Sequence, residues 1–265
     1  MRFCRFQFNG QAEYGLVENL AGQDAVTRLL TKAPDDGGDL EDLPTKRISP
    51  ISLAEAKLLV PVRPSKIICV GRNYRAHAAE LGNEVPQEPL LFFKPPSSLL
   101  ASGENILRPR ISQRTDYEGE LGVVIGRRCH KLSPDEDVRP YILGYTVMND
   151  FTARDIQKQD SQWTRGKGYD TFCPVGPLVT NEIDPWAGID VETRVNGEVR
   201  QHGNTRDFIF PLDVIIRYVA DVMTLLPGDL IATGTPEGVG PVVAGDVVEV
   251  TVPGVGTLKN SVADE

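Results

Sequence analysis

Two glutamates, Glu118 and Glu120, stand on either side of Gly119 at the start of an apolar, β-branched run that ends at Gly126. Such a run predicts a strand buried on both faces, along which the two carboxylates point to one side and Gly119 leaves the other side open. At an assumed separation of ~5–6 Å and an effective dielectric near 20, their repulsion costs about 3 kcal/mol. A cation or a proton is needed to relieve it, although a solvated strand face is the plainer alternative.

A third carboxylate favours the cation. Asn149-Asp150 follows the strand-like residues 141–148, at a position where a loop can turn an acid into a site. Three carboxylates without neighbouring His or Cys predict oxygen-only ligation, and therefore Mg²⁺, Mn²⁺ or Ca²⁺ before Zn²⁺. Three acids against one dication leave an excess negative charge, so we expect cationic side chains around the rest of the site.

A possible general base lies on a second segment. Residues 66–71 predict a strand, and residues 72–82 a helix that Asn73 would cap. On this helix His77 and Glu80 are three residues apart and share one face. The pair is either an ordinary surface contact or a histidine that a carboxylate orients to activate water. Its place after a strand favours the second interpretation.

Cationic and polar side chains follow Asp150. Residues 151–157 predict a helical turn that places Arg154 and Gln157 on a common side. Lys167 stands between two glycines, a flexible context from which an ammonium can reach a ligand. The glycine-rich residues 234–240 lack the sequence of a nucleotide-binding loop, but their backbone N–H groups could contact a carboxylate.

Composition limits the classes of partner. The chain has 265 residues and a net charge of −9, without a Lys/Arg cluster, which disfavours nucleic acid and anionic membranes as partners. The sequence has neither a signal-peptide core nor a transmembrane run, so we expect a cytoplasmic protein. The four cysteines are widely spaced and predict small buried side chains in a reducing compartment.

The elements divide the chain into two parts. Residues 1–60 predict a small N-terminal β/α module with a short meander and a helix over residues 25–32, and residues 61–265 a larger domain that contains the candidate site residues. In the second part Asn196-Gly197 predicts a tight hairpin, and residues 211–226 a helix.

Several ordered motifs resemble the fumarylacetoacetate hydrolase family, in particular its short acylpyruvase and oxaloacetate decarboxylase-like members. They cover about three-quarters of the chain. The matching segments are Val70-Gly71-Arg72-Asn73-Tyr74 with His77, Phe93-Lys94-Pro95, Tyr117-Glu118-Gly119-Glu120-Leu121, Asn149-Asp150 with Thr152-Ala153-Arg154-Asp155, Lys167-Gly168 with Asp170-Thr171-Phe172, and Leu226-Pro227-Gly228-Asp229 with Gly234-Thr235-Pro236.

The resemblance implies an α+β fold, a mixed β-roll with peripheral helices, in a homodimer. It also implies Mg²⁺ or Mn²⁺ at the positions of Glu118, Glu120 and Asp150. The remaining implied site residues are the catalytic His77 and Glu80 on a helix that orders as a lid, Lys167 near the reacting end of the substrate, and the pocket positions Arg72, Tyr74, Arg154, Gln157 and Thr235.

The expected reaction is hydrolysis of a C–C bond in a 2,4-dioxo acid, an acylpyruvate such as acetylpyruvate or fumarylpyruvate, through a metal-bound pyruvate enolate. The short N-terminal module does not resemble the longer barrel domain of fumarylacetoacetate hydrolase itself, which argues against fumarylacetoacetate as the substrate. The same enolate also fits an oxaloacetate decarboxylase, or an isomerase or tautomerase of a 2-oxo (2-hydroxy-dienoate) dicarboxylic acid. A non-catalytic metal-binding protein is the alternative from a different class.

Overall fold

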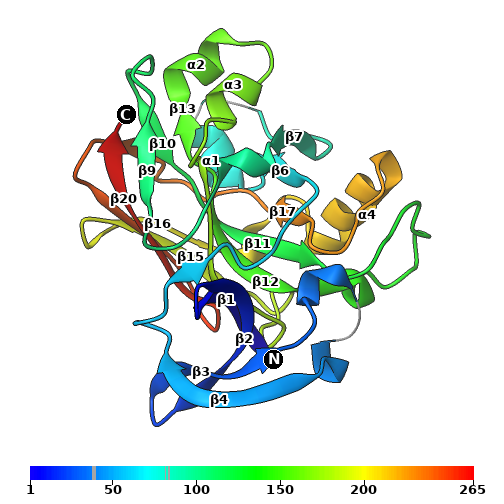
Figure 1. The fold of residues 1–265 in the computed structure, drawn as a ribbon. Helices are drawn as coiled ribbons and strands as arrows, with labels where there is room; N and C mark the ends of the chain where they lie inside the picture. Colours follow the sequence, from blue (N-terminus) through cyan, green and yellow to red (C-terminus); the bar gives the residue numbers. More distant parts are fainter. Residues whose placement is uncertain (38–39, 81, 83) are drawn as a thin grey trace.

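The molecule, described here by a computed structural model that covers residues 1–37, 40–80, 82 and 84–265, consists of three β-sheets and a few short helices (Figure 1). Within these residues the sheets contain twelve, three and five strands, with both parallel and antiparallel pairs. This arrangement confirms the predicted α+β class of mixed sheets with peripheral helices.

The N-terminal module is an antiparallel meander of β1 (Arg2–Phe8), β2 (Gln11–Leu20), β3 (Gln23–Leu30) and β4 (Thr45–Ser52). The helix predicted over residues 25–32 was wrong, because most of this segment is β3. Ala21 and Gly22 have φ of 52° and 90°, and this tight turn folds β3 back onto β2. Pairing with strands on both sides thus decides the conformation.

The meander continues into the large sheet, since β1 pairs with β14 (Cys173–Thr180). In spatial order the sheet then runs through β12 (Ile142–Asn149), β11 (Gly119–Ile125), β17 (Leu230–Ala232), β6 (Ile67–Gly71) and β7 (Leu90–Lys94), while β5 (Leu58–Leu59) pairs with β1 and β8 (Leu99–Leu100) with β14. Every residue of β11 and β14 is buried, as expected for strands covered on both faces.

The five-stranded sheet packs against β11, β12 and β14 of the large sheet. The five-stranded sheet has the order β16 (Glu198–Asn204), β15 (Asp190–Val195), β19 (Val247–Val252), β20 (Gly256–Asp264) and β9 (Asn105–Arg108), and the three-stranded sheet the order β13 (Thr152–Ala153), β10 (Thr115–Tyr117) and β18 (Gly240–Val242). The predicted hairpin at Asn196-Gly197 is confirmed, since these residues have φ of 54° and 82° and join β15 to β16.

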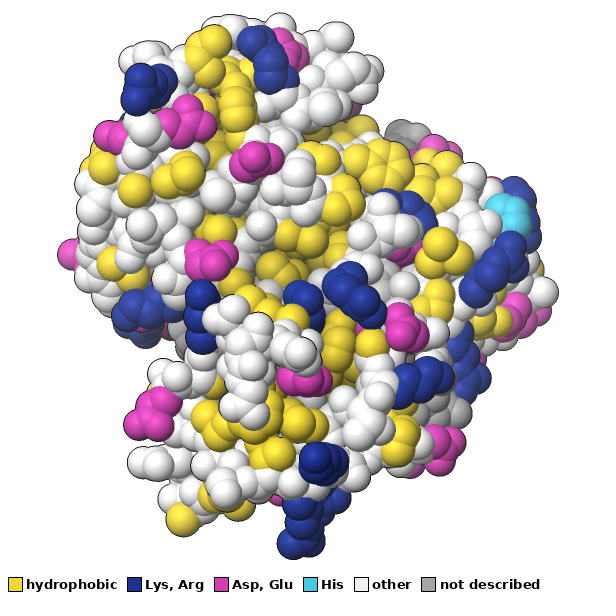
Figure 2. Space-filling model, in the orientation of Figure 1, with side chains coloured by type: hydrophobic (Ala, Val, Ile, Leu, Met, Phe, Trp, Pro, Cys, Tyr) yellow, Lys and Arg dark blue, Asp and Glu magenta, His cyan; other side chains and the backbone are white. Residues whose placement is uncertain are grey.

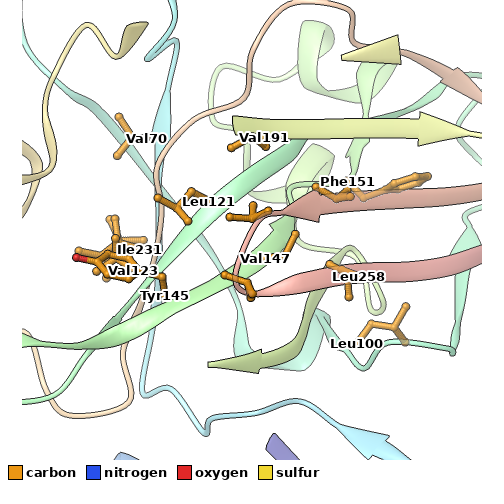
Figure 3. Close-up of a cluster of buried hydrophobic side chains, with 14 of the residues drawn as sticks. Val70, Leu100, Leu121, Val123, Tyr145, Val147, Phe151, Val191, Ile231 and Leu258 are labelled. Carbon is orange, nitrogen blue, oxygen red and sulfur yellow. The ribbon is translucent and has the colours of Figure 1, made fainter. Parts of the chain in front are cut away.

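The main core lies between the large and the five-stranded sheets. Figure 3 shows Leu121 and Val147 of the large sheet near Val191 and Leu258 of the other, and all four side chains are buried. At Gly119 the sheets approach so closely that an added Cβ would lie 2.1 Å from the Thr193 hydroxyl. The expectation that Gly119 leaves its face open was therefore wrong, because β15 fills that space.

The helices are α1 (Arg75–Glu80), α2 (Arg154–Gln159), α3 (Thr164–Lys167) and α4 (Leu212–Val222). α1 is shorter than the predicted residues 72–82, and α4 lies within the predicted residues 211–226. Asn73 is buried and bonds Phe210 and Thr233 instead of capping α1. In the part of the chain described, every helix is too short or too polar to cross a membrane.

All four cysteines are buried and none forms a disulfide, as the sequence predicts. Burial raises the pKa of the Cys4 and Cys173 thiols to about 12. Figure 2 shows basic and acidic side chains interspersed with apolar ones on one face of the molecule, without a large area of one charge sign.

Candidate active site

Three buried carboxylates meet where β11 and β12 lie side by side. The antiparallel pairing of Gly119 with Asn149 places Asp150 beside Glu118, and the Asp150 N–H donates to the Glu118 carbonyl at 2.8 Å. Glu118, Glu120 and Asp150 are at most 5 % exposed, and each offers an oxygen within 4.8 Å of the others. Strand alternation and strand pairing thus assemble the predicted cluster.

Three buried cations surround the carboxylates. The Lys167 ammonium donates to Glu118 at 2.8 Å and to Asp150 at 2.5 Å, and the Lys94 ammonium donates to Asp150 at 2.6 Å. The Arg154 guanidinium donates to Glu118 at 2.5 Å. Glu120 instead accepts a backbone N–H, that of Gly234, at 2.6 Å.

These charges move the pKa values of the two glutamates in opposite directions. Burial alone would raise the pKa of Glu118, but Lys167 and Arg154 outweigh burial and hold it well below its usual range. Burial and the charges of Asp150 and Glu118 raise the pKa of Glu120 well above its usual value. Burial also opposes the charge of Lys167, yet Asp150 and Glu118 raise its pKa, so the ammonium stays charged.

The cluster fits a hard divalent cation. Its donors are carboxylate oxygens alone, which Mg²⁺ and Mn²⁺ prefer over the nitrogen and sulfur ligands typical of zinc. Glu120 has no cationic partner among the described residues, and burial and the neighbouring carboxylates raise its pKa, which a bound dication would oppose. Glu118, Glu120 and Asp150 are therefore the residues that would hold such an ion.

His77 and Glu80 lie together on α1. The His77 Nδ1 is 3.3 Å from one Glu80 carboxylate oxygen, and the other oxygen accepts the Gly238 N–H at 3.0 Å. His77 is 4 % exposed, whereas the Glu80 side chain is 32 % exposed. The carboxylate can thus orient the ring and leave Nε2 for a reactant.

A cavity of about 570 Å³ brings these groups together. Ten of the eleven site residues predicted from the sequence line it: Arg72, His77, Glu80, Glu118, Glu120, Asp150, Arg154, Gln157, Lys167 and Thr235. The rest of its wall includes the apolar Val70, Phe92, Trp163 and Val239 and the cationic Arg114 and Lys158.

Tyr74 is the predicted residue that the structure places outside the cavity wall. Tyr74 is buried, and its ring packs against that of Phe208 with 5.1 Å between the ring centroids. Thr235 lines the cavity, but its hydroxyl donates to the Gly119 carbonyl at 2.9 Å and accepts from Gln201 at 2.8 Å. These bonds give Thr235 a role in holding the site together.

Arg72 and Arg154 differ in how they are held. Arg72 has φ of 60°, an uncommon conformation for a residue with a side chain, and no ion-pair partner in the described part of the chain. Arg154 donates to Gln157 at 2.7 Å and to the buried Asp116 at 2.8 Å. Arg154 is thus fixed in place, and the charge of Arg72 is available to a ligand.

Sequence reasoning assigned no role to Lys94, Asp116 or Gln201. Lys94 and Asp116 lay inside segments already singled out, but nothing local indicated that their partners are Asp150 and Arg154. Nothing in the sequence indicated a role for Gln201, which lies on β16 in another sheet and accepts the Gly119 N–H at 3.0 Å. Each of these roles depends on contacts between distant parts of the chain.

Comparison with protein families gives two matches along the chain. Residues 66–263 match the family model described as fumarylacetoacetate (FAA) hydrolase C-terminal. Residues 1–61 match the model described as Rv2993c-like, N-terminal.

Two relatives have names that describe a reaction. The 2,4-didehydro-3-deoxy-L-rhamnonate hydrolase of a Sphingomonas species is 39 % identical in an alignment of 282 residues in length, which covers 100 % of this chain and 96 % of the relative. The oxaloacetate tautomerase YisK of Bacillus subtilis is 43 % identical over 225 residues, which span 80 % of this chain and 74 % of the relative.

Solved structures have the same fold. The 5-carboxymethyl-2-hydroxymuconate delta-isomerase of Mycobacterium smegmatis superposes with a TM-score of 0.89 at 38 % identity, covering 100 % of both chains. The fumarylpyruvate hydrolase of Pseudomonas aeruginosa, in complex with Mn²⁺ and pyruvate, superposes with a TM-score of 0.71 at 33 % identity, covering 78 % of this chain and 91 % of the other.

Proposed function

This chain belongs to the fumarylacetoacetate hydrolase family, and from that premise we propose that it uses Mg²⁺ or Mn²⁺ to hydrolyse a C–C bond in a 2,4-dioxo acid. The chain is an enzyme of this family, whose named relatives include hydrolases, an isomerase and a tautomerase. The choice of hydrolysis among these reactions is the proposal.

One observation carries this choice. The His77–Glu80 pair opens into the same cavity as the three carboxylates, so a water-activating base faces the site that would hold a cation. Hydrolysis needs both an activated water and a stabilised leaving group. An isomerase has no comparable need for water.

The charge of the cavity supports an anionic substrate. Five cationic side chains line it, against the carboxylates of Glu80 and the three-acid cluster, although the whole chain carries −9. A dication at the cluster would raise the local positive charge further. The cavity would therefore attract a carboxylate-bearing 2-oxo acid.

In the proposed reaction His77 takes a proton from water while the water oxygen forms a bond to C4 of the substrate. The C3–C4 bond then breaks, its electron pair stays on C3, and a carboxylic acid and the pyruvate enolate are released. The proton held by His77 returns to C3 and gives pyruvate. A cation bound by Glu118, Glu120 and Asp150 would supply Lewis-acid stabilisation of negative charge on the 2-oxo acid portion.

The other cavity side chains have supporting roles. Glu80 keeps the His77 ring oriented, and Lys167 stabilises the oxyanion at C4 with an ammonium that stays charged. Arg154 and Gln157, which line the cavity and are hydrogen-bonded to each other, bind substrate oxygen atoms. Arg72 lines the cavity and binds the anionic end of the substrate, since its guanidinium has no ion-pair partner among the described residues.

Oxaloacetate chemistry is the second candidate. The 43 % identical relative named oxaloacetate tautomerase favours it, and an enolate can be stabilised at this site in tautomerisation or decarboxylation as well. Tautomerisation moves a proton but needs no added water. Replacing His77 thus distinguishes the two candidates less clearly than the choice of substrate does.

We expect protein stripped of metal to release no pyruvate from acetylpyruvate or oxaloacetate, and to regain activity when Mg²⁺ or Mn²⁺ is added. Pyruvate formed from acetylpyruvate would support the hydrolase. Pyruvate formed from oxaloacetate alone, or interconversion of its keto and enol forms without pyruvate, would favour the second candidate, and turnover of neither substrate with either metal would contradict the proposal.

A further pair of measurements tests the role of His77. We expect His77→Ala to abolish hydrolysis of acetylpyruvate and to leave metal affinity, measured by calorimetry, nearly unchanged, because His77 is not among the proposed ligands. Equal losses of both would contradict the assigned roles.

The homodimer implied by the family resemblance stays a prediction. Light scattering of the purified protein would measure its oligomeric state.

A further inference from the structure

The glycine-rich residues 234–240 hold two carboxylates of the chain itself. At one end the Gly234 N–H donates to Glu120 at 2.6 Å, and at the other the Gly238 N–H donates to Glu80 at 3.0 Å. Glu120 is a proposed metal ligand, and Glu80 orients the proposed base. We propose that this loop fixes the His77–Glu80 pair relative to the metal site, and that the Tyr117 hydroxyl is a positioning group that holds the loop.

Tyr117 acts on the end of the loop that contacts Glu80. Its hydroxyl donates to the Gly238 carbonyl at 2.8 Å, so both polar backbone groups of Gly238 are engaged. Tyr117 is 3 % exposed and is absent from the cavity wall, whereas Glu118, the next residue, lines the cavity. Tyr117 is therefore linked to Glu80 by hydrogen bonds through the loop.

The conformation of Gly238 makes this contact specific. Gly238 has φ of 94°, and an added Cβ would lie 2.0 Å from the Arg200 carbonyl oxygen. The loop thus passes directly over β16 with no space for a side chain. Only a well-held backbone can keep the N–H aimed at Glu80.

The middle of the loop is fixed from the same strand. Gln201 donates to the Thr235 hydroxyl and to the Pro236 carbonyl, both at 2.8 Å, and accepts from the Gly119 N–H. The loop is therefore bonded to β11, which carries Glu120, and its position follows that of the metal-binding strand.

Glu80 needs such support because its side chain is one-third exposed. Among the described contacts, its carboxylate is held by His77, on the same short helix, and by Gly238, on the loop. Without the Gly238 contact, solvent would compete for the carboxylate and the ring of His77 would lose its fixed orientation. This consequence rests on the proposed function of His77 and Glu80.

The test replaces Tyr117 by Phe, which removes one hydroxyl. We expect kcat for the substrate that proves active to fall about tenfold, with KM and metal affinity nearly unchanged, because the reacting groups remain but are less well oriented. Tyr141→Phe is the matched control, since it removes a hydroxyl that bonds Glu136 far from the cavity, and should leave kcat unchanged.

A double-mutant cycle separates positioning from general damage. If Tyr117 acts through Glu80, Tyr117→Phe should have no further effect on kcat in a Glu80→Ala background. The same fall in kcat in both backgrounds would overturn the proposal.

Hydrogen–deuterium exchange provides a readout that does not need turnover. We expect Tyr117→Phe to speed exchange in α1 and in residues 234–240 and to leave β12 unchanged, whereas Tyr141→Phe should alter neither α1 nor the loop. If the enzyme hydrolyses no 2,4-dioxo acid but α1 still responds, the proposed function fails and the positioning role stands. Unchanged exchange in α1 would overturn the positioning role.

Discussion

At the scale of single residues, buried cations in the site pair with two of its three buried carboxylates, Glu118 and Asp150. Lys94 is the least expected of them, because its ammonium is completely buried between Asp150 and the Phe151 carbonyl, at 2.6 and 3.0 Å. A buried carboxylate that loses a partner of this kind keeps its desolvation cost without compensation.

We therefore expect Lys94→Met to lower the free energy of unfolding of the metal-stripped protein by about 3 kcal/mol, as for other broken buried ion pairs. Urea unfolding followed by circular dichroism measures this change. Lys131→Met is the control, because its ion pair with Asp221 is exposed and should contribute nothing measurable. Similar stabilities for both variants would show that Lys94 does not stabilise Asp150.

At the scale of elements, the 3₁₀ helix Pro34–Asp36 joins the N-terminal module to the segment before β6. Asp35 accepts the Tyr14 hydroxyl at 2.7 Å and the Arg63 N–H at 2.8 Å, and its carboxylate pairs with the Arg63 guanidinium. Burial alone would raise the pKa of Asp35, but these partners outweigh burial and lower it.

Because the pKa of Asp35 is lower in the folded state, the unfolded chain binds the proton more readily and the contribution to stability is lost as the pH falls through the acidic range. We expect Asp35→Asn to cost about 1 kcal/mol at pH 7 and much less near pH 3. Urea unfolding at both pH values measures this difference.

Asp36→Asn serves as the comparison for this pH dependence, since Asp36 also pairs with Arg63 but is exposed. It should change stability little at either pH. A cost for Asp35→Asn that is the same at pH 7 and pH 3 would contradict the role of its charge.

The elements also explain which features could be predicted from sequence. Strand alternation places Glu118 and Glu120 on one side, and the end of the next strand supplies Asp150, so the cluster follows from local pattern. The helix wrongly predicted over residues 25–32 shows the limit, because partners in β2 and β4 determine β3. Likewise, no local pattern could indicate that Gln201 reaches Gly119, 82 residues away in sequence.

At the scale of the whole molecule, the N-terminal module and the rest of the chain share one sheet and the same clusters of buried hydrophobic residues. Phe3 of β1 pairs with Val179 of β14, and Tyr14 and Leu30 belong to the same buried cluster as Val175. Figure 1 shows β1 to β4 at the bottom of the molecule, and the pairing of β1 with β14 makes them part of the large sheet. The predicted boundary at residue 60 therefore does not separate two cores.

We expect the full chain to unfold in a single thermal transition, with equal calorimetric and van't Hoff enthalpies, because the shared core couples the two parts. Differential scanning calorimetry measures both enthalpies. Two separate transitions, with residues 1–60 melting first, would contradict this coupling.

The buried thiols have a practical consequence for such experiments. Thiol-directed reagents react with the exposed thiolate, and all four cysteines are buried, with the pKa of Cys4 and Cys173 near 12. A cysteine introduced at the exposed Arg75 of α1 would therefore be labelled by a maleimide fluorophore against a low background. Single-site fluorescence spectroscopy of α1 would therefore not require removal of the native cysteines.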